Sequence, residues 1–81
     1  MTTKQDFDAT AQQIFHGIGG YGSSCTTEND RVISFKIISP EQWVIVQQFD
    51  QHRPIEGQIY EALGRLVAAI NKAKNADDQP A

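Results

Sequence analysis

The sequence is poor in three features on which many small proteins depend: cysteine, long apolar runs and excess positive charge. Its one cysteine, Cys25, cannot form a disulfide within the chain, which excludes the disulfide framework of a secreted mini-protein. Aliphatic or aromatic runs such as Trp43–Val46 are too short for a signal peptide or a membrane span. We therefore expect a cytoplasmic protein with no membrane partner.

Charge and length narrow the classes of function further. Ten acidic and seven basic residues give a net charge of −3, so the chain lacks the excess of positive charge that is typical of nucleic-acid-binding proteins. A chain of 81 residues forms one small domain, and a domain of this size buries only roughly 60 % of its unfolded surface. Self-association or binding to a partner is an expected supplement to such a small core.

The first part of the chain predicts a helix followed by a β-hairpin. Apolar residues recur at spacings of three and four over 4–18, and Thr3 with Asp6 forms a capping pair at the start. Glycines near residue 19 end this helix. Strands are expected at 21–27 and 31–38 around a turn, with Ile33, Phe35 and Ile37 on the packed side of the second strand. The first strand is polar and is expected at a sheet edge.

The segment from Pro40 to about Gln51 is ambiguous. Ser39 resembles a helix N-cap that forms a box with Gln42, which favours a helix. The run Trp43–Val46 instead favours a strand, paired with 31–38 across a short turn. We take the helix as the prediction and the strand as its alternative.

A third helix is predicted from Ile55, where an apolar stripe continues to Ile70 and Lys72 and Lys74 lie at the C-terminal end. The predicted domain covers 4–74, with flexible termini at 1–3 and 75–81. The expected fold class is α+β, in the order helix, β-hairpin, helix, helix, with the helices on one face of a short antiparallel sheet.

No motif in the sequence predicts catalysis, a metal or a cofactor. The string from Gly17 to Gly22 matches G-x-G-x-x-G, but a dinucleotide site needs a strand before it and a helix after it, the reverse of the predicted order. Cys25, His16 and His52 have no spacing typical of a thiol–imidazole pair. Asp50, His52 and Glu56 do not specify a zinc site. We expect no enzyme activity and no bound cofactor.

One segment has a local resemblance to a known family. SPEQWVIVQQFDQHRPI followed by IYEALG, over Ser39–Gly64, resembles the stretch of winged-helix transcriptional regulators that leads into a helix-turn-helix. The resemblance implies a supporting helix at Ile59–Gly64, then a turn and a basic recognition helix. Here, however, the apolar stripe continues through Arg65–Ile70 without a turn signal. DNA binding by a helix-turn-helix is therefore kept as the alternative function.

Small residues on the third helix indicate a possible contact surface. Gly57, Gly64 and Ala68 lie near one another on a helix, and interior glycines cost about 1 kcal/mol each relative to alanine. Another element is therefore expected against this face, either from the same chain or from a second subunit in a homodimer.

The favoured function is protein binding. We expect a small acidic accessory or inhibitor protein, of the kind that phages and other mobile elements encode, that docks on a larger host protein. Its candidate contact residues, if exposed, are the large aromatic residues Tyr21, Trp43, Phe49 and Tyr60.

Overall fold

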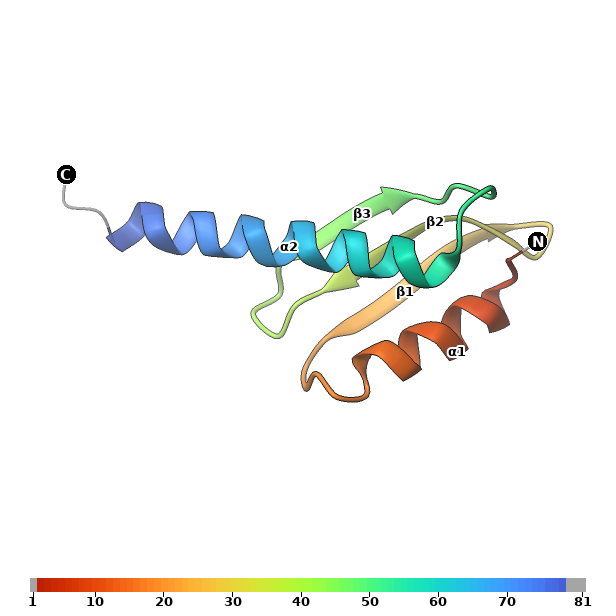
Figure 1. Ribbon diagram of the computed structural model, residues 1–81, viewed down its shortest axis with the longest axis horizontal. Coiled ribbons are helices and arrows are strands. Elements are labelled where there is room, and N and C mark those ends of the chain that lie inside the picture. The colour runs from red at the N-terminus through yellow and green to blue at the C-terminus, as the bar shows by residue number, and fades with distance from the viewer. Residues whose placement is uncertain (1, 79–81) are drawn as a thin grey trace.

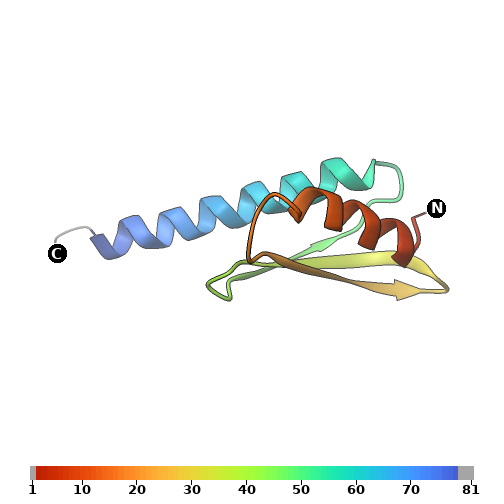
Figure 2. The ribbon, with the colours of Figure 1, turned by 90° about the horizontal axis from the view of Figure 1, so that it is seen from below.

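A computed structural model describes residues 2–78 of the chain, with side chains over 2–75. The elements follow the order α1 (Lys4–Phe15), β1 (Gly22–Glu28), β2 (Arg31–Ile38), β3 (Val44–Gln48) and α2 (Ile55–Asp78). The three strands form an antiparallel sheet in the order β1-β2-β3. Both helices lie on the same face of this sheet, as Figure 2 shows from the side. The predicted α+β class, with helices on one sheet face, is confirmed.

Helix α1 begins as its sequence predicts. The Thr3 hydroxyl accepts a hydrogen bond from Asp6 N–H at 3.2 Å, and Thr3 N–H donates to the Asp6 carboxylate at 3.1 Å. The helix ends at Phe15, three residues before the predicted end. Ile18 is therefore outside the helix and exposed.

The β1–β2 hairpin closes through Asn29 and Asp30, both of which have positive φ (52° and 64°). Positive φ at both central residues is the geometry of a type I′ turn, whose twist matches that of the paired strands. The predicted hairpin is therefore confirmed, with polar β1 at one edge of the sheet.

A bulge in β2 changes which residues face the core. Thr26 pairs with Ser34 but Thr27 pairs with Val32, so Ile33 is an extra residue in β2. Val32 and Phe35 are consequently both buried, although strict alternation would separate them, and Ile33 is exposed. The prediction that Ile33 packs with Phe35 and Ile37 is wrong for this reason.

The predicted helix over 40–51 is also wrong, because this segment forms a turn and strand β3. Ser39 C=O accepts from Gln42 N–H at 2.9 Å, and Gln42 has a φ of 72°, outside the helical range. The buried Ser39 hydroxyl accepts from Trp43 N–H at 3.0 Å, so it stabilises a hairpin turn instead of a helix start. The β-branched run after Trp43 then pairs with β2, as the alternative prediction states.

The core lies between the sheet and the two helices. Phe7 of α1 packs against Phe35 of β2 with ring centroids 5.5 Å apart. The buried apolar residues come from both helices, from the central strand β2 and from the residue after β3: Phe7, Ala11, Val32, Phe35, Ile37, Phe49, Ile59, Ala62, Leu66 and Ile70. Helix α2 therefore supplies four of these ten residues, which makes it the main cover of the β2–β3 side.

Helix α2 exceeds its predicted length. It reaches Asp78, so residues 75–78, predicted as part of a flexible end, are helical; residues 79–81 lie outside the described part. At the other end of the chain, Thr2 C=O accepts a hydrogen bond from Val32 N–H at 2.9 Å. Helix α2 thus continues past residue 74, and Thr2, before α1, is hydrogen-bonded to the sheet.

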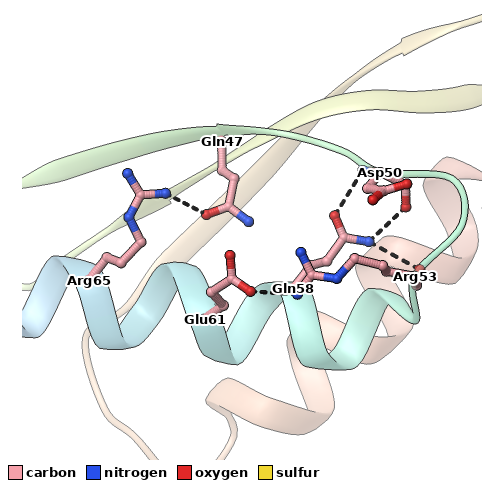
Figure 3. Close-up of polar contacts among 6 residues, drawn as sticks. All are labelled: Gln47, Asp50, Arg53, Gln58, Glu61 and Arg65. Carbon is pink, nitrogen blue, oxygen red and sulfur yellow. Dashed lines mark hydrogen bonds and ion pairs between the residues drawn. The ribbon is translucent and has the colours of Figure 1, made fainter.

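The loop between β3 and α2 is held by one buried side chain, Gln58. Its amide oxygen accepts from Asp50 N–H at 2.9 Å, and its amide nitrogen donates to the C=O groups of Asp50 (2.8 Å) and Arg53 (3.0 Å), as Figure 3 shows. A buried amide with all these partners fixes the direction in which α2 leaves the sheet.

We predict that Gln58→Ala lowers the free energy of unfolding by roughly 1 to 3 kcal/mol, because it leaves three part-buried backbone groups of the loop without their partner. The matched control is the exposed Gln48→Ala, which is expected to change stability by less than about 0.5 kcal/mol. Urea denaturation of the three proteins measures both values. Equal stabilities would show that the loop does not depend on this amide.

A second prediction concerns Gly20, which has a φ of +88° and packs against the β2–β3 turn. A Cβ at this position would lie 2.8 Å from Pro40 Cγ, so Gly20→Ala should cost about 2 kcal/mol through strain and overlap. Gly19→Ala is the control, since its Cβ would meet nothing within 4 Å. Thermal unfolding that ranks the two variants the other way would contradict this account.

Candidate functional site

The nucleophilic and imidazole groups named by the sequence are not assembled into a site. Cys25 lies on β1 opposite Phe35, on the helix-covered face. His52 lies in the β3–α2 loop, where its backbone N–H donates to Asp50 Oδ1 at 2.9 Å. Over the part of the chain that the structure describes, no three His, Cys, Asp or Glu side chains come together in a metal-binding group.

Burial raises the pKa of the Cys25 thiol, and the negative charge of Asp8 raises it further, while Lys4 acts in the opposite direction. Asp8 and Lys4 themselves form an ion pair of 3.2 Å on α1. A raised pKa keeps the thiol protonated near neutral pH, which is the reverse of the activation that a nucleophilic cysteine needs.

A shallow depression of about 360 Å³ lies where α1 meets β1. Phe15 and Tyr21 form part of its wall, with their rings stacked at 6.1 Å and 8°. The remaining lining residues are mostly polar or small: Asp8, Ala11, Gln12, His16 and Ser23. Tyr21, one of the predicted contact residues, is half-buried in this stack.

The other face of the sheet, which we call the open face, is covered by no described element (Figure 2). The register places three apolar side chains on it: Val44 lies opposite Ile38, and Val46 lies two residues further along β3, opposite Lys36. Val44 and Val46 are 52 % and 62 % exposed. We call Ile38, Val44 and Val46 the apolar corner of the open face.

Lys36 is the charged residue beside the apolar corner. The ion pairs among the described side chains are Lys4–Asp8, Arg53–Glu61 and Lys74–Glu41, and none of them includes Lys36. Near the apolar corner the open face is uncharged, with Gly22, Ser24, Thr26, Ser34 and Gln48, and the charged pair Glu28 and Arg31 lies at the far end of the β1–β2 hairpin. The arrangement can therefore bind an apolar group with an acidic neighbour.

The four predicted contact residues are not brought together. Trp43, in the turn just before β3, is 41 % exposed. Tyr60, on α2, is 52 % exposed. Phe49 directly follows β3, at a position whose side chain faces the helices. It is therefore buried in the core and is unavailable as a surface anchor.

The predicted small-residue face of α2 is open. A Cβ added at Gly57 or Gly64 would meet nothing within 4 Å, and Ala68 is exposed. No described segment of the chain packs against this face. Its role as a dimer interface stays a prediction.

The residues of the apolar corner are not among the contact residues predicted from the sequence. Its signal is the alternation Val44, Ile45, Val46, Gln47, in which every second residue faces away from the helices once the segment is a strand. If 40–51 were a helix, Val44 and Val46 would lie on different faces of it and would not form a common apolar surface.

The helix-turn-helix implied by the winged-helix resemblance is not formed. Ser39–Gln48 is a turn and strand, and Ile59–Gly64 continues into Arg65 and beyond as one helix without a turn. The geometry that would place a recognition helix in a DNA groove is therefore absent from the described residues.

Comparisons with known proteins found no match: no family model, no curated protein and no solved structure matches this chain. In the described residues, neither helix has the length and apolar character required to cross a membrane.

The raised pKa of Cys25 predicts slow alkylation by iodoacetamide at pH 8, with a rate that rises as the pH passes above the ordinary value of 9.0. Because ionisation is disfavoured in the folded state, folding stability is also expected to fall as pH rises through this raised pKa. Asp8→Asn should speed alkylation at pH 8 and Lys4→Gln should slow it. Asp30→Asn, in the distant hairpin turn, is the control; a response equal to that of Asp8→Asn would refute the assignment.

Proposed function

We propose that this protein is a non-catalytic binding module of the reducing cytosol that docks on a larger protein as an accessory or inhibitor. The observation that carries the proposal is the apolar corner, where two valines more than half exposed lie side by side with Ile38 on a sheet face that no described element covers. Exposed apolar groups that are contiguous and rimmed by polar residues are typical of interaction surfaces.

The chemistry of the surface specifies the kind of partner. Apolar contact with Val44 and Val46 supplies the affinity, and Lys36 beside them selects a partner with a carboxylate near its own apolar side chains. The net charge of −3 disfavours nucleic acid as the partner, because phosphate binding needs a basic surface.

The single cysteine supports the proposed compartment. Cys25 is a half-buried free thiol whose raised pKa lowers its reactivity, and one cysteine forms no disulfide within the chain.

The test is site-specific photo-crosslinking in cells. A photoreactive amino acid at Val44 should form an adduct with a protein larger than two copies of this chain, whereas the same group at exposed Gln13 on α1 should not. Adducts of the size of two copies report self-association and are separated by mass. No heavy adduct at Val44, or equal heavy adducts at both positions, would refute the docking surface.

A charge-reversal pair sharpens the test. Lys36→Glu is expected to reduce the heavy adduct at Val44 about tenfold, equivalent to about 1.4 kcal/mol, because it opposes the partner's carboxylate with a like charge. Lys4→Glu makes the same change of charge on exposed α1 and should leave the yield within about twofold. An equal loss from both variants would show that net charge, and not the open face, controls binding.

A further inference from the structure

The outer edge of β3 has unpaired backbone groups. Ser39 N–H donates to Trp43 C=O at 2.8 Å and Phe49 N–H donates to Ile33 C=O at 3.0 Å. These two bonds show that the backbone groups of the odd-numbered residues of this segment face β2. Peptide groups along a strand alternate in direction. The N–H and C=O groups of Val44, Val46 and Gln48 therefore point away from β2, at the edge where the sheet ends.

This edge lacks the protection that natural edge strands carry. Charged residues, proline, bulges or a covering element normally prevent such strands from pairing with another chain. The segment Trp43–Phe49 contains no charged residue, proline or glycine. Helix α2 lies over the face of the sheet and leaves the outer side of β3 open, as Figure 1 shows.

We propose that β3 pairs in antiparallel register with β3 of a second copy of this chain, about a two-fold axis through Val46, to form a six-stranded sheet. In this register Val46 lies opposite its own copy, and Val44 lies opposite Gln48. The outward peptide groups of all three residues find partners, and no charged residue opposes another.

Charges on α2 favour a second copy over an unrelated strand. Arg65 reaches Gln47 of β3 at 3.0 Å (Figure 3), so its side of the helix lies toward β3. Glu61 and Lys72, four residues before and seven after it, share that side. The two-fold axis runs the two α2 helices antiparallel, which brings Lys72 of each copy toward the Glu61–Arg53 ion pair of the other, while each Arg65 stays bonded to Gln47 of its own chain.

The interface area sets the expected strength. The area that a pair of five-residue strands buries is smaller than the ~800 Å² per partner of a standard interface. Contacts between the two α2 helices must therefore add to it, and we expect a weak dimer. Its test therefore uses high protein concentration. The dimer also joins the two open faces, so the apolar corners of both copies adjoin on one continuous surface.

Disulfide trapping tests the register. In a Cys25→Ser background, Val46→Cys places two thiols on directly opposed residues about 5.5 Å apart at Cα, within the range that a disulfide spans. Mild oxidation should convert most of this variant to a covalent dimer. Val44→Cys is the control, because its two copies would lie roughly 13 Å apart along the strands. No dimer from Val46→Cys, or equal dimer from both, would overturn the proposal.

A backbone variant provides the second measurement. Val46→Pro removes only an outward N–H, so the β2–β3 ladder is retained while edge pairing is blocked. Sedimentation should give a dimer for the wild type and for Val46→Thr, and a monomer for Val46→Pro with an unchanged circular dichroism spectrum. A wild type that is monomeric at high concentration, or a dimer that survives Val46→Pro through another face such as that of Gly57 and Gly64, would show the proposal to be wrong. If Val46→Pro unfolds, the disulfide series decides.

Discussion

The extra residue in β2 is the constraint on which the other contacts depend. By shifting the pairing between Thr26 and Thr27, the bulge turns Val32 into the core beside Phe35. The peptide groups of Val32 then serve other parts of the chain: its N–H donates to Thr2 C=O, and its C=O accepts from Gln51 Nε2 at 2.7 Å. The start of α1 and the entry to α2 are thereby fixed to one point of the sheet.

The same end of the sheet positions both helices. The Thr3–Asp6 capping box begins α1 just after Thr2, and the Gln58 amide closes the loop into α2. Because both helices pack on one face of the sheet, the opposite face is exposed to solvent. The exposure of its valines is therefore a consequence of the chain topology as well as of the sequence.

Local signals explain which parts of the fold were predictable from the sequence. The capping box, the type I′ turn and the stripe of α2 are each specified by residues within a few positions of one another. The bulge at Ile33 and the hairpin at Ser39 are not, because the first depends on cross-strand register and the second on whether Trp43 pairs with β2. The apolar corner depends on the second of these, so it was missed. Trp43 and Tyr60, which were named as contact residues on the condition that they are exposed, are exposed, and their role in binding stays a prediction.

Helix α2 is the last element in the chain, yet it provides Ile59, Ala62, Leu66 and Ile70 to the core. At about 5 to 20 residues per second, a ribosome needs roughly one to five seconds to make its 24 residues. Throughout that interval the β2–β3 side of the completed β-meander lacks the cover that α2 provides, and only α1 lies over its inner face. Newly made chains thus pass through a short period in which a chaperone, or a neighbouring nascent chain, has access to apolar surface that the finished molecule conceals.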